Sequence, residues 1–198
     1  ARSGFPVGAD GSLSDEVLEW YDPLGPADAI RDRLARLAAP GLRHGDPAPL
    51  VDFTQIRNIV AAASDAQVMS DFKATVDWLA DQAFVNKRKQ AVTGFCWGGA
   101  QVWLACQRFR AFKCGVAWYG RLSRPAAGQF LSEPERQWPL ELVGSLKAPV
   151  LGLYGGKDLG IPQTDVEAMR AALKATRKTG SDLIVYPDAQ HGFHADYR

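Results

Sequence analysis

Three residues with the chemistry for nucleophilic catalysis each follow a separate apolar segment of the chain. Cys96 lies in GFCWGG, Asp158 follows PVLGLYGGK, and His191 lies in PDAQHGF. A cysteine thiol becomes a strong nucleophile when an imidazole takes its proton, and a carboxylate can orient the imidazole and stabilise its charge. Cys96, His191 and Asp158 are therefore candidates for the nucleophile, the base and the orienting acid of one catalytic site.

The spacing around Cys96 matches the pattern Gly-x-nucleophile-x-Gly of a tight turn between a strand and a helix. We expect glycine at 94 and 98 because the two backbones pass too closely for a side chain, which forces the nucleophile outward. The helix N-terminus would favour the Cys96 thiolate, and the N–H of Trp97 would be one oxyanion donor. A second donor would come from an earlier strand-to-helix loop. The simpler alternative is a glycine-rich turn that holds a buried cysteine.

The remaining cysteines point to no metal or disulfide chemistry. The chain has three cysteines, an odd number, and none of them forms a CxxC pair. This spacing fits neither a disulfide framework nor a zinc-thiolate site. We expect Cys106 and Cys114 to be small buried hydrophobic residues, and we expect no metal and no cofactor.

Strands and helices must alternate to bring these candidates together. Near-continuous apolar runs predict strands over residues 90–95, 114–119, 149–155 and 182–186, with helices over about 98–110 and from Thr164, capped by Thr164–Glu167, to before Gly180. A Ser64–Gln67 capping box predicts a helix of about sixteen residues before them, with Val68, Phe72, Val76 and Leu79 on one face. This alternation indicates an α/β fold whose parallel sheet is covered by helices on both faces. Chemistry in such sheets lies beyond the carboxyl ends of the strands, where all three candidates fall.

Length and composition indicate a globular α/β domain. The 198 residues suffice for one domain over 1–198, although residues 1–40 are atypical, since the chain begins with a stretch rich in Gly, Pro and Asp. A net charge of +1 lacks the basic excess that is typical of proteins that bind nucleic acid or an acidic membrane. The chain shows neither an apolar run long enough for a membrane span nor a secretory signal. We therefore expect a cytoplasmic enzyme or binding domain.

Four segments carry a resemblance to a known family. GFCWGG, AWYGRL, PVLGLYGGKD and YPDAQHGFHADYR resemble the dienelactone hydrolases, also called carboxymethylenebutenolidases, over about residues 64–198. The resemblance implies an α/β-hydrolase fold and places Cys96, Asp158 and His191 on the family's catalytic triad. The segment RHGDP resembles a family loop whose arginine helps to hold the substrate carboxylate, so Arg43 is a candidate substrate-binding residue. A second substrate arginine of the founding members is not matched, because Ala195 occupies its position.

The resemblance is weaker at both ends of the sequence. Family members carry several strands before the region of Arg43, one of which ends in an active-site glutamate and contributes the other oxyanion donor. Residues 1–40 do not show the pattern of those strands. Glu19 is a candidate for a remnant of the family glutamate. The helix that usually follows the catalytic histidine in the family is not expected after His191. We therefore expect the early strands to be missing or divergent, and the strand over residues 90–95 to expose an edge that favours self-association.

The leading hypothesis is a hydrolase that cleaves a small ester or lactone through a thioester on Cys96. One alternative is a catalytically weak or inactive remnant of such a hydrolase that acts as a binding or structural protein. Another is a serine-hydrolase-like esterase in which the cysteine is only a variant nucleophile. The expected partner is a small-molecule ester or lactone, and neither nucleic acid nor a membrane is expected.

Overall fold

A computed structural model describes residue 57 and residues 60–178 and 180–194 of the chain. The chain divides into two compact units, the first comprising Ala1–Val60 with Asp81–Val85 and the second comprising Ala61–Ala80 with Asn86–Arg198. All three candidate catalytic residues belong to the second unit. The single domain over residues 1–198 stays a prediction.

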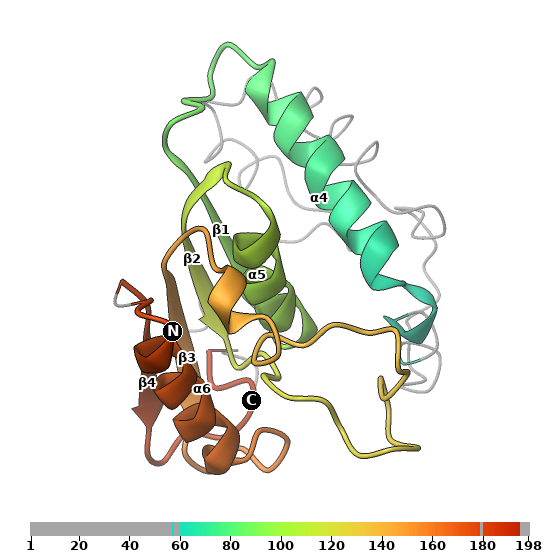
Figure 1. Cartoon of the computed structure of the whole chain (residues 1–198), viewed down its shortest axis with the longest axis vertical. Helices are drawn as coiled ribbons and strands as arrows, with labels where there is room; N and C mark the ends of the chain where they lie inside the picture. The colour runs from blue at the N-terminus through green and yellow to red at the C-terminus, as the bar shows by residue number, and fades with distance from the viewer. Residues whose placement is uncertain (1–56, 58–59, 179, 195–198) are drawn as a thin grey trace, which may run out of the picture. The chain divides into compact units, whose positions relative to one another are not determined.

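The second unit is built on four parallel strands that lie in chain order, as Figure 1 shows. The strands are β1 (Gln90–Phe95), β2 (Phe112–Trp118), β3 (Val150–Gly155) and β4 (Asp182–Tyr186). The helices are α4 (Asp65–Ala80), α5 (Trp97–Arg108) and α6 (Gln163–Ala175), with a short 3-10 helix, η2 (Val143–Ser145). The register pairs Phe95 with Trp118 and Trp118 with Leu153, so the carboxyl ends of neighbouring strands meet at one edge of the sheet.

Most predicted elements are confirmed, and one predicted helix cap is wrong. Strands β1 and β4 have the predicted bounds, and α4 has the predicted sixteen residues, with the Gln67 N–H donating to Ser64 Oγ at 3.2 Å. Helix α6 begins at Gln163, before the expected cap at Thr164, and its N-cap position is Pro162. No side chain caps this helix, and its first turn closes with the Asp165 N–H donating to Pro162 O at 3.0 Å.

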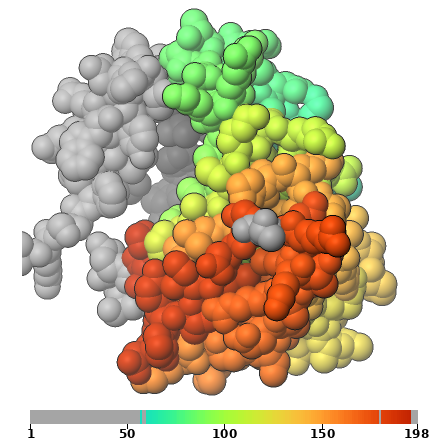
Figure 2. Space-filling view, turned by 60° about the vertical axis from the view of Figure 1, so that its left-hand side comes forward, coloured from blue at the N-terminus to red at the C-terminus, as the bar shows by residue number. Residues whose placement is uncertain are grey.

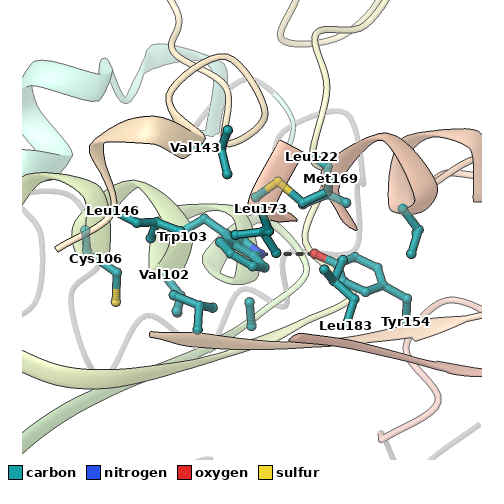
Figure 3. Close-up of a cluster of buried hydrophobic side chains, with 14 of the residues drawn as sticks. Val102, Trp103, Cys106, Leu122, Val143, Leu146, Tyr154, Met169, Leu173 and Leu183 are labelled. Atoms are coloured by element: carbon teal, nitrogen blue, oxygen red, sulfur yellow. Dashed lines mark hydrogen bonds between the residues drawn. The ribbon is translucent and has the colours of Figure 1, made fainter. Parts of the chain in front are cut away.

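The core lies between the sheet and the helices α5 and α6, which cover the same face (Figure 3). Trp103 of α5 is fully buried and donates its Nε1–H to the Tyr154 hydroxyl of β3 at 3.1 Å. Helix α4 contributes Phe72, whose ring packs edge-on against Phe112. In the space-filling view of Figure 2, the C-terminal part of the second unit, coloured orange to red, forms one continuous surface.

The opposite face of the sheet carries exposed side chains in the described part of the chain, which corrects one expectation. Gly115 faces Val102 and Cys106 of α5, and successive strand residues point to opposite faces. Cys114 therefore points away from α5 and is exposed, so its predicted burial is wrong, whereas Cys106 is buried as expected. The helices α5 and α6 cover one face, and in the described part of the chain Phe95, Ile184 and Tyr186 remain 41–43% exposed.

Strand β1 pairs with β2 alone among the residues that the structure describes. The described sheet therefore has β1 at one edge, and the self-association expected from such an edge stays a prediction. No helix in the described part of the chain is long and apolar enough to cross a membrane.

Candidate active site

Cys96 occupies the turn between β1 and α5, and its backbone is strained. Its φ of 53° and ψ of −119° lie in a region that non-glycine residues rarely adopt. Such a conformation costs about 1–3 kcal/mol and persists only where the surroundings hold it. Two hydrogen bonds do so here, from the Cys96 N–H to Trp118 O at 3.0 Å and from the Gly99 N–H to Cys96 O at 3.0 Å. The turn leaves the Cys96 side chain exposed at the start of the helix.

The glycines that this turn requires differ in part from those expected. A Cβ on Gly94 would lie 2.5 Å from Gly98 O, so glycine is needed at 94 as predicted. A Cβ on Gly98 would meet nothing within 4 Å, so the predicted steric need for glycine there is wrong. A Cβ on Gly99 would lie 2.4 Å from Trp118 O. The first turn of α5 therefore lies close to the end of β2 at position 99, and glycine is needed there.

Asp158 and His191 lie in two loops that run side by side after β3 and β4. The Gly156 N–H donates to Tyr186 O at 2.8 Å, and the Lys157 N–H donates to Ala189 O at 2.9 Å. These bonds continue the pairing of the two strands beyond their ends. The loop that carries the carboxylate is therefore fixed against the loop that carries the imidazole.

The structure brings the three predicted residues together. His191 Nδ1 lies 2.7 Å from Asp158 Oδ2, and His191 Nε2 lies 3.3 Å from Cys96 Sγ, both within hydrogen-bonding distance. The Asp158 side chain is 1% exposed, and its Oδ1 accepts the Gly160 N–H at 2.8 Å. A buried carboxylate held at both oxygens can orient the imidazole toward the sulfur.

The contacts of His191 set the charge state of the pair. The hydrogen bond with His191 holds the pKa of the Cys96 thiol below its ordinary value, aided by the positive charge of the imidazole and by the Trp97 N–H, and opposed by burial. The hydrogen bond with Asp158, followed by the one with Cys96, raises the pKa of His191 to about 9. The two shifts both favour the pair of a Cys96 thiolate and a His191 imidazolium. In contrast, burial raises the pKa of the Cys106 thiol to about 12.

We expect iodoacetamide to alkylate Cys96 faster than Cys114 or Cys106 at pH 7. The thiolate is the reactive form, and the lowered pKa of Cys96 should place the midpoint of its alkylation at a lower pH than that of an unperturbed thiol. The measurement is the rate of labelling of each cysteine-containing peptide between pH 5 and 9.

A His191→Asn variant is the matched control for this experiment, because it removes the imidazole and should move the midpoint for Cys96 upward. Equal rates for Cys96 and the exposed Cys114 at pH 7 would contradict the thiolate assignment. Cys106 should react only after unfolding, since it is 0% exposed.

A cavity of about 190 Å³ opens beside Cys96 and His191. Its base is one face of α5, where the lining positions Trp97, Ala100, Gln101 and Leu104 follow helical spacing. Its remaining walls come from the start of α4 and from loops, and the lining residues there are Asp65, Cys96, Tyr119, Arg121, Phe130, Leu131, Arg136, Gln137, Trp138, Gly160, Ile161 and His191. The exposed lining is mainly apolar, and the cavity is smaller than the roughly 300–1,000 Å³ of pockets for drug-sized ligands. A small, largely apolar molecule fits this space.

Two arginines hold the segment over residues 121–147 that forms much of this wall. Arg136, 6% exposed, contacts Glu133 at 2.6 Å and Asp65 at 3.6 Å and donates to Ala61 O at 2.6 Å. Arg124 donates to Glu141 at 3.0 Å and to the Arg136 carbonyl at 2.7 Å. The segment has little regular secondary structure, so these charged hydrogen bonds take the place of a helix or sheet ladder.

The other predicted site residues are only partly described. The Trp97 N–H points to the sulfur of Cys96, and its side chain lines the cavity. Tyr119 also lines the cavity and packs edge-on against His191, with ring centroids 5.0 Å apart. Arg43 and Glu19 lie outside the described residues, as do Ala195 and the earlier loop expected to supply the second oxyanion donor.

Sequence analysis did not single out several residues that line the cavity. The signal for Gln101 was available, because it lies one turn after Trp97 on a predicted helix. Arg121 stands within AWYGRL, but its type alone did not separate it from a surface arginine. Trp138 belongs to a segment without periodicity, which gives no indication of where it folds. Among the described residues no group of three or more His, Cys, Asp or Glu side chains could hold a metal ion.

The strand order, the strained turn and the positions of the three residues together define the class of the fold. A parallel sheet carries the nucleophile candidate after one strand, the acid after a later strand and the histidine after the last, all at the carboxyl edge. This is an α/β-hydrolase fold.

Comparison with known proteins gives the family. The model of the Dienelactone hydrolase family matches residues 43–198. The chain is 40% identical over 96% of its length to a "Putative carboxymethylenebutenolidase" of Methylorubrum extorquens, of which it covers 67%. It is 38% identical over 98% of its length to a protein of the same name from Salmonella typhimurium, of which it covers 72%. The crystal structure of a "Putative Dienelactone Hydrolase" from Klebsiella pneumoniae matches with a TM-score of 0.68 and 40% identity, over 85% of this chain and 72% of that one.

The chain therefore belongs to the dienelactone hydrolase family and is a hydrolase of that family. The alignments with the two sequence relatives extend over 96% and 98% of the chain, so they reach into residues 1–40, which the resemblance read from the sequence did not cover.

Proposed function

We propose that the chain hydrolyses a small ester or lactone, with Cys96 as the nucleophile, His191 as the proton carrier and Asp158 as the residue that orients His191. The observation that carries this proposal is the chain of contacts from Asp158 Oδ2 through His191 to Cys96 Sγ, with distances of 2.7 and 3.3 Å. The small apolar cavity beside the sulfur gives the substrate a place to bind. The names of the sequence relatives refer to a butenolide, an unsaturated lactone, which supports the same substrate class.

In the first half of the proposed reaction, the Cys96 thiolate attacks the carbonyl carbon and a C–S bond forms. The carbonyl oxygen takes up the negative charge, and the Trp97 N–H is one donor toward it. As the C–O bond breaks, the imidazolium of His191 gives its proton to the leaving oxygen. The products of this half are the free alcohol, or the opened end of a lactone, and a thioester on Cys96.

In the second half, neutral His191 takes a proton from a water molecule, which attacks the thioester carbonyl. The C–S bond breaks, the acid is released and the thiolate returns beside the protonated imidazole. Asp158 stays ionised throughout and stabilises the imidazolium that forms at each stage. No redox step and no cofactor enters this sequence.

The decisive experiment is to trap the thioester. The protein is mixed with p-nitrophenyl acetate, quenched with acid and examined by mass spectrometry of the intact chain and of its peptides. We expect one acetyl group per chain, on the peptide that contains Cys96, and its removal by hydroxylamine.

Two variants make the result specific. Cys96→Ala should not become acetylated, whereas Cys114→Ala, which removes an exposed thiol from β2, should be acetylated like the wild type. A folded protein without acetylation at Cys96 would favour the alternative of a non-catalytic binding or structural protein. Acetylation at another residue would contradict the assigned nucleophile.

A further inference from the structure

The loop that carries Asp158 runs from the end of β3 to the start of α6, and its two halves are held differently. The first half is paired with the loop of His191 through two backbone hydrogen bonds. In the described part of the chain, no backbone hydrogen bond ties residues 159–161 to another segment, and Leu159 is 100% exposed. Side-chain contacts must therefore hold the second half of the loop in place.

The position of Gly160 decides where the Asp158 carboxylate points. The Gly160 N–H donates to Asp158 Oδ1 at 2.8 Å, while Asp158 Oδ2 lies 2.7 Å from His191 Nδ1. The two contacts hold both oxygens of one planar group, so a shift of Gly160 would turn the carboxylate away from the imidazole. Glycine allows more backbone freedom than any other residue, so this position needs an external contact to stay fixed.

Arg121, which follows β2, supplies a contact to Gly160. Its Nη2 donates to the carbonyl oxygen of Gly160 at 3.1 Å. The backbone on both sides of the arginine has little room to move, since a Cβ on Gly120 would lie 2.2 Å from Ala100 N and Leu122 is 0% exposed. The guanidinium therefore holds Gly160 from a firmly packed part of the chain.

Gln163, the first residue of α6, supplies a contact at the other end of the loop. Its Nε2 donates to Gly155 O at 3.0 Å. The same carbonyl accepts the Asp158 N–H at 3.4 Å, which is longer than the usual range of roughly 2.7–3.2 Å. The Gln163 amide is thus the closer donor to this carbonyl, and α6 is itself anchored in the core by Val166 and Met169, both 0% exposed.

We propose that Gln163 and Arg121 are positioning residues that hold the Asp158 carboxylate toward His191 from the two ends of its loop. Both act through backbone carbonyls, and they come from two elements that are far apart in the sequence. Their importance for turnover rests on the proposed function. Their effect on the contact between Asp158 and His191 does not, because that contact exists in the protein without substrate.

The test measures this contact through the pKa of His191. The hydrogen bond with Asp158 is the largest cause that raises this pKa, so a displaced carboxylate should lower it. The measurement is an NMR titration of the His191 Cε1–H signal in Cys96→Ala, where no thiol titrates together with the imidazole. The chain has three histidines, and His191→Gln in the same background assigns the signal.

In this background, Gln163→Met and Arg121→Gln should each lower the pKa of His191 toward its value in Asp158→Asn, which removes the carboxylate charge. The direction is diagnostic for Arg121, because loss of a nearby cation would by itself raise the pKa of an imidazole. Arg121→Lys keeps the charge and a donor and should recover part of the loss. Arg110→Gln, which removes an exposed arginine outside the cavity, should leave the pKa unchanged.

Kinetics with Cys96 present separate this inference from the proposed function. Gln163→Met should lower kcat/KM for p-nitrophenyl acetate by about 2- to 10-fold, the range for loss of one hydrogen bond. If no thioester forms on Cys96, a lowered pKa of His191 in the variants still supports the positioning role while the proposed function fails. If the thioester forms, an unchanged pKa of His191 in Gln163→Met or Arg121→Gln, or a raised pKa in Arg121→Gln, overturns the role of that residue.

Discussion

Replacement of Cys96 by alanine is expected to lower kcat/KM for an activated ester by roughly 10⁴-fold or more, as removal of a nucleophile does in other covalent hydrolases. The variant keeps the cavity and the Trp97 N–H but has no atom that can form the thioester. The measurement is release of p-nitrophenol from p-nitrophenyl acetate, corrected for spontaneous hydrolysis. The free energy of unfolding, measured by urea titration, shows whether the variant still folds like the wild type.

Cys114→Ala is the matched control, because it removes a thiol from the neighbouring strand on the face away from α5 and should keep wild-type turnover. Cys96→Ser tests the alternative in which the cysteine is a variant of a serine nucleophile. A serine hydroxyl stays protonated beside an imidazolium, so we expect Cys96→Ser to be far slower than the wild type. Wild-type activity in folded Cys96→Ala would exclude Cys96 as the nucleophile.

The strands could be predicted because their signal is local. The runs over residues 90–95 and 182–186 are apolar and end in glycine, proline or polar residues, and β1 and β4 have those bounds. The same regularity predicted that Cys96, Asp158 and His191 share one edge of the sheet, because parallel strands place their carboxyl ends together. The 2.7 Å distance between His191 and Asp158 follows from the pairing of the two loops beyond β3 and β4.

Features that depend on contacts between distant segments could not be predicted in the same way. Cys114 lies in an apolar strand, but the burial of its side chain depends on which face of the sheet α5 covers. Thr164 has the composition of a helix cap, yet Pro162 occupies the N-cap position. The cavity wall over residues 121–147 has no periodicity, and Arg136 joins it to carbonyl groups near residue 61, 75 positions earlier. Such pairings leave no pattern in a single sequence.

The turn around Cys96 combines a local pattern, the glycine at 94, with a contact between distant segments at Gly99. Substitution at Gly99 is expected to have a large effect on stability and activity. Gly99→Ala should lower the free energy of unfolding by about 1–3 kcal/mol or more, because overpacking costs this much and the new Cβ would lie 2.4 Å from Trp118 O. Trp118 O also accepts the Cys96 N–H at 3.0 Å. Relief of the clash by separating α5 from β2 should therefore release Cys96 from its strained backbone and lower turnover as well.

Gly98→Ala is the control, since it adds the same methyl group one residue earlier, where nothing lies within 4 Å. Alanine is favoured over glycine in a helix by roughly 0.5–1 kcal/mol, so this variant should be at least as stable as the wild type. Urea titration followed by tryptophan fluorescence measures both variants, and the transition slope shows whether each unfolds in the same manner. If Gly99→Ala matches Gly98→Ala in stability, the end of β2 can move away from α5 at little cost. The position of Cys96 would then depend on the backbone of residues 94–98 rather than on the contact between α5 and β2.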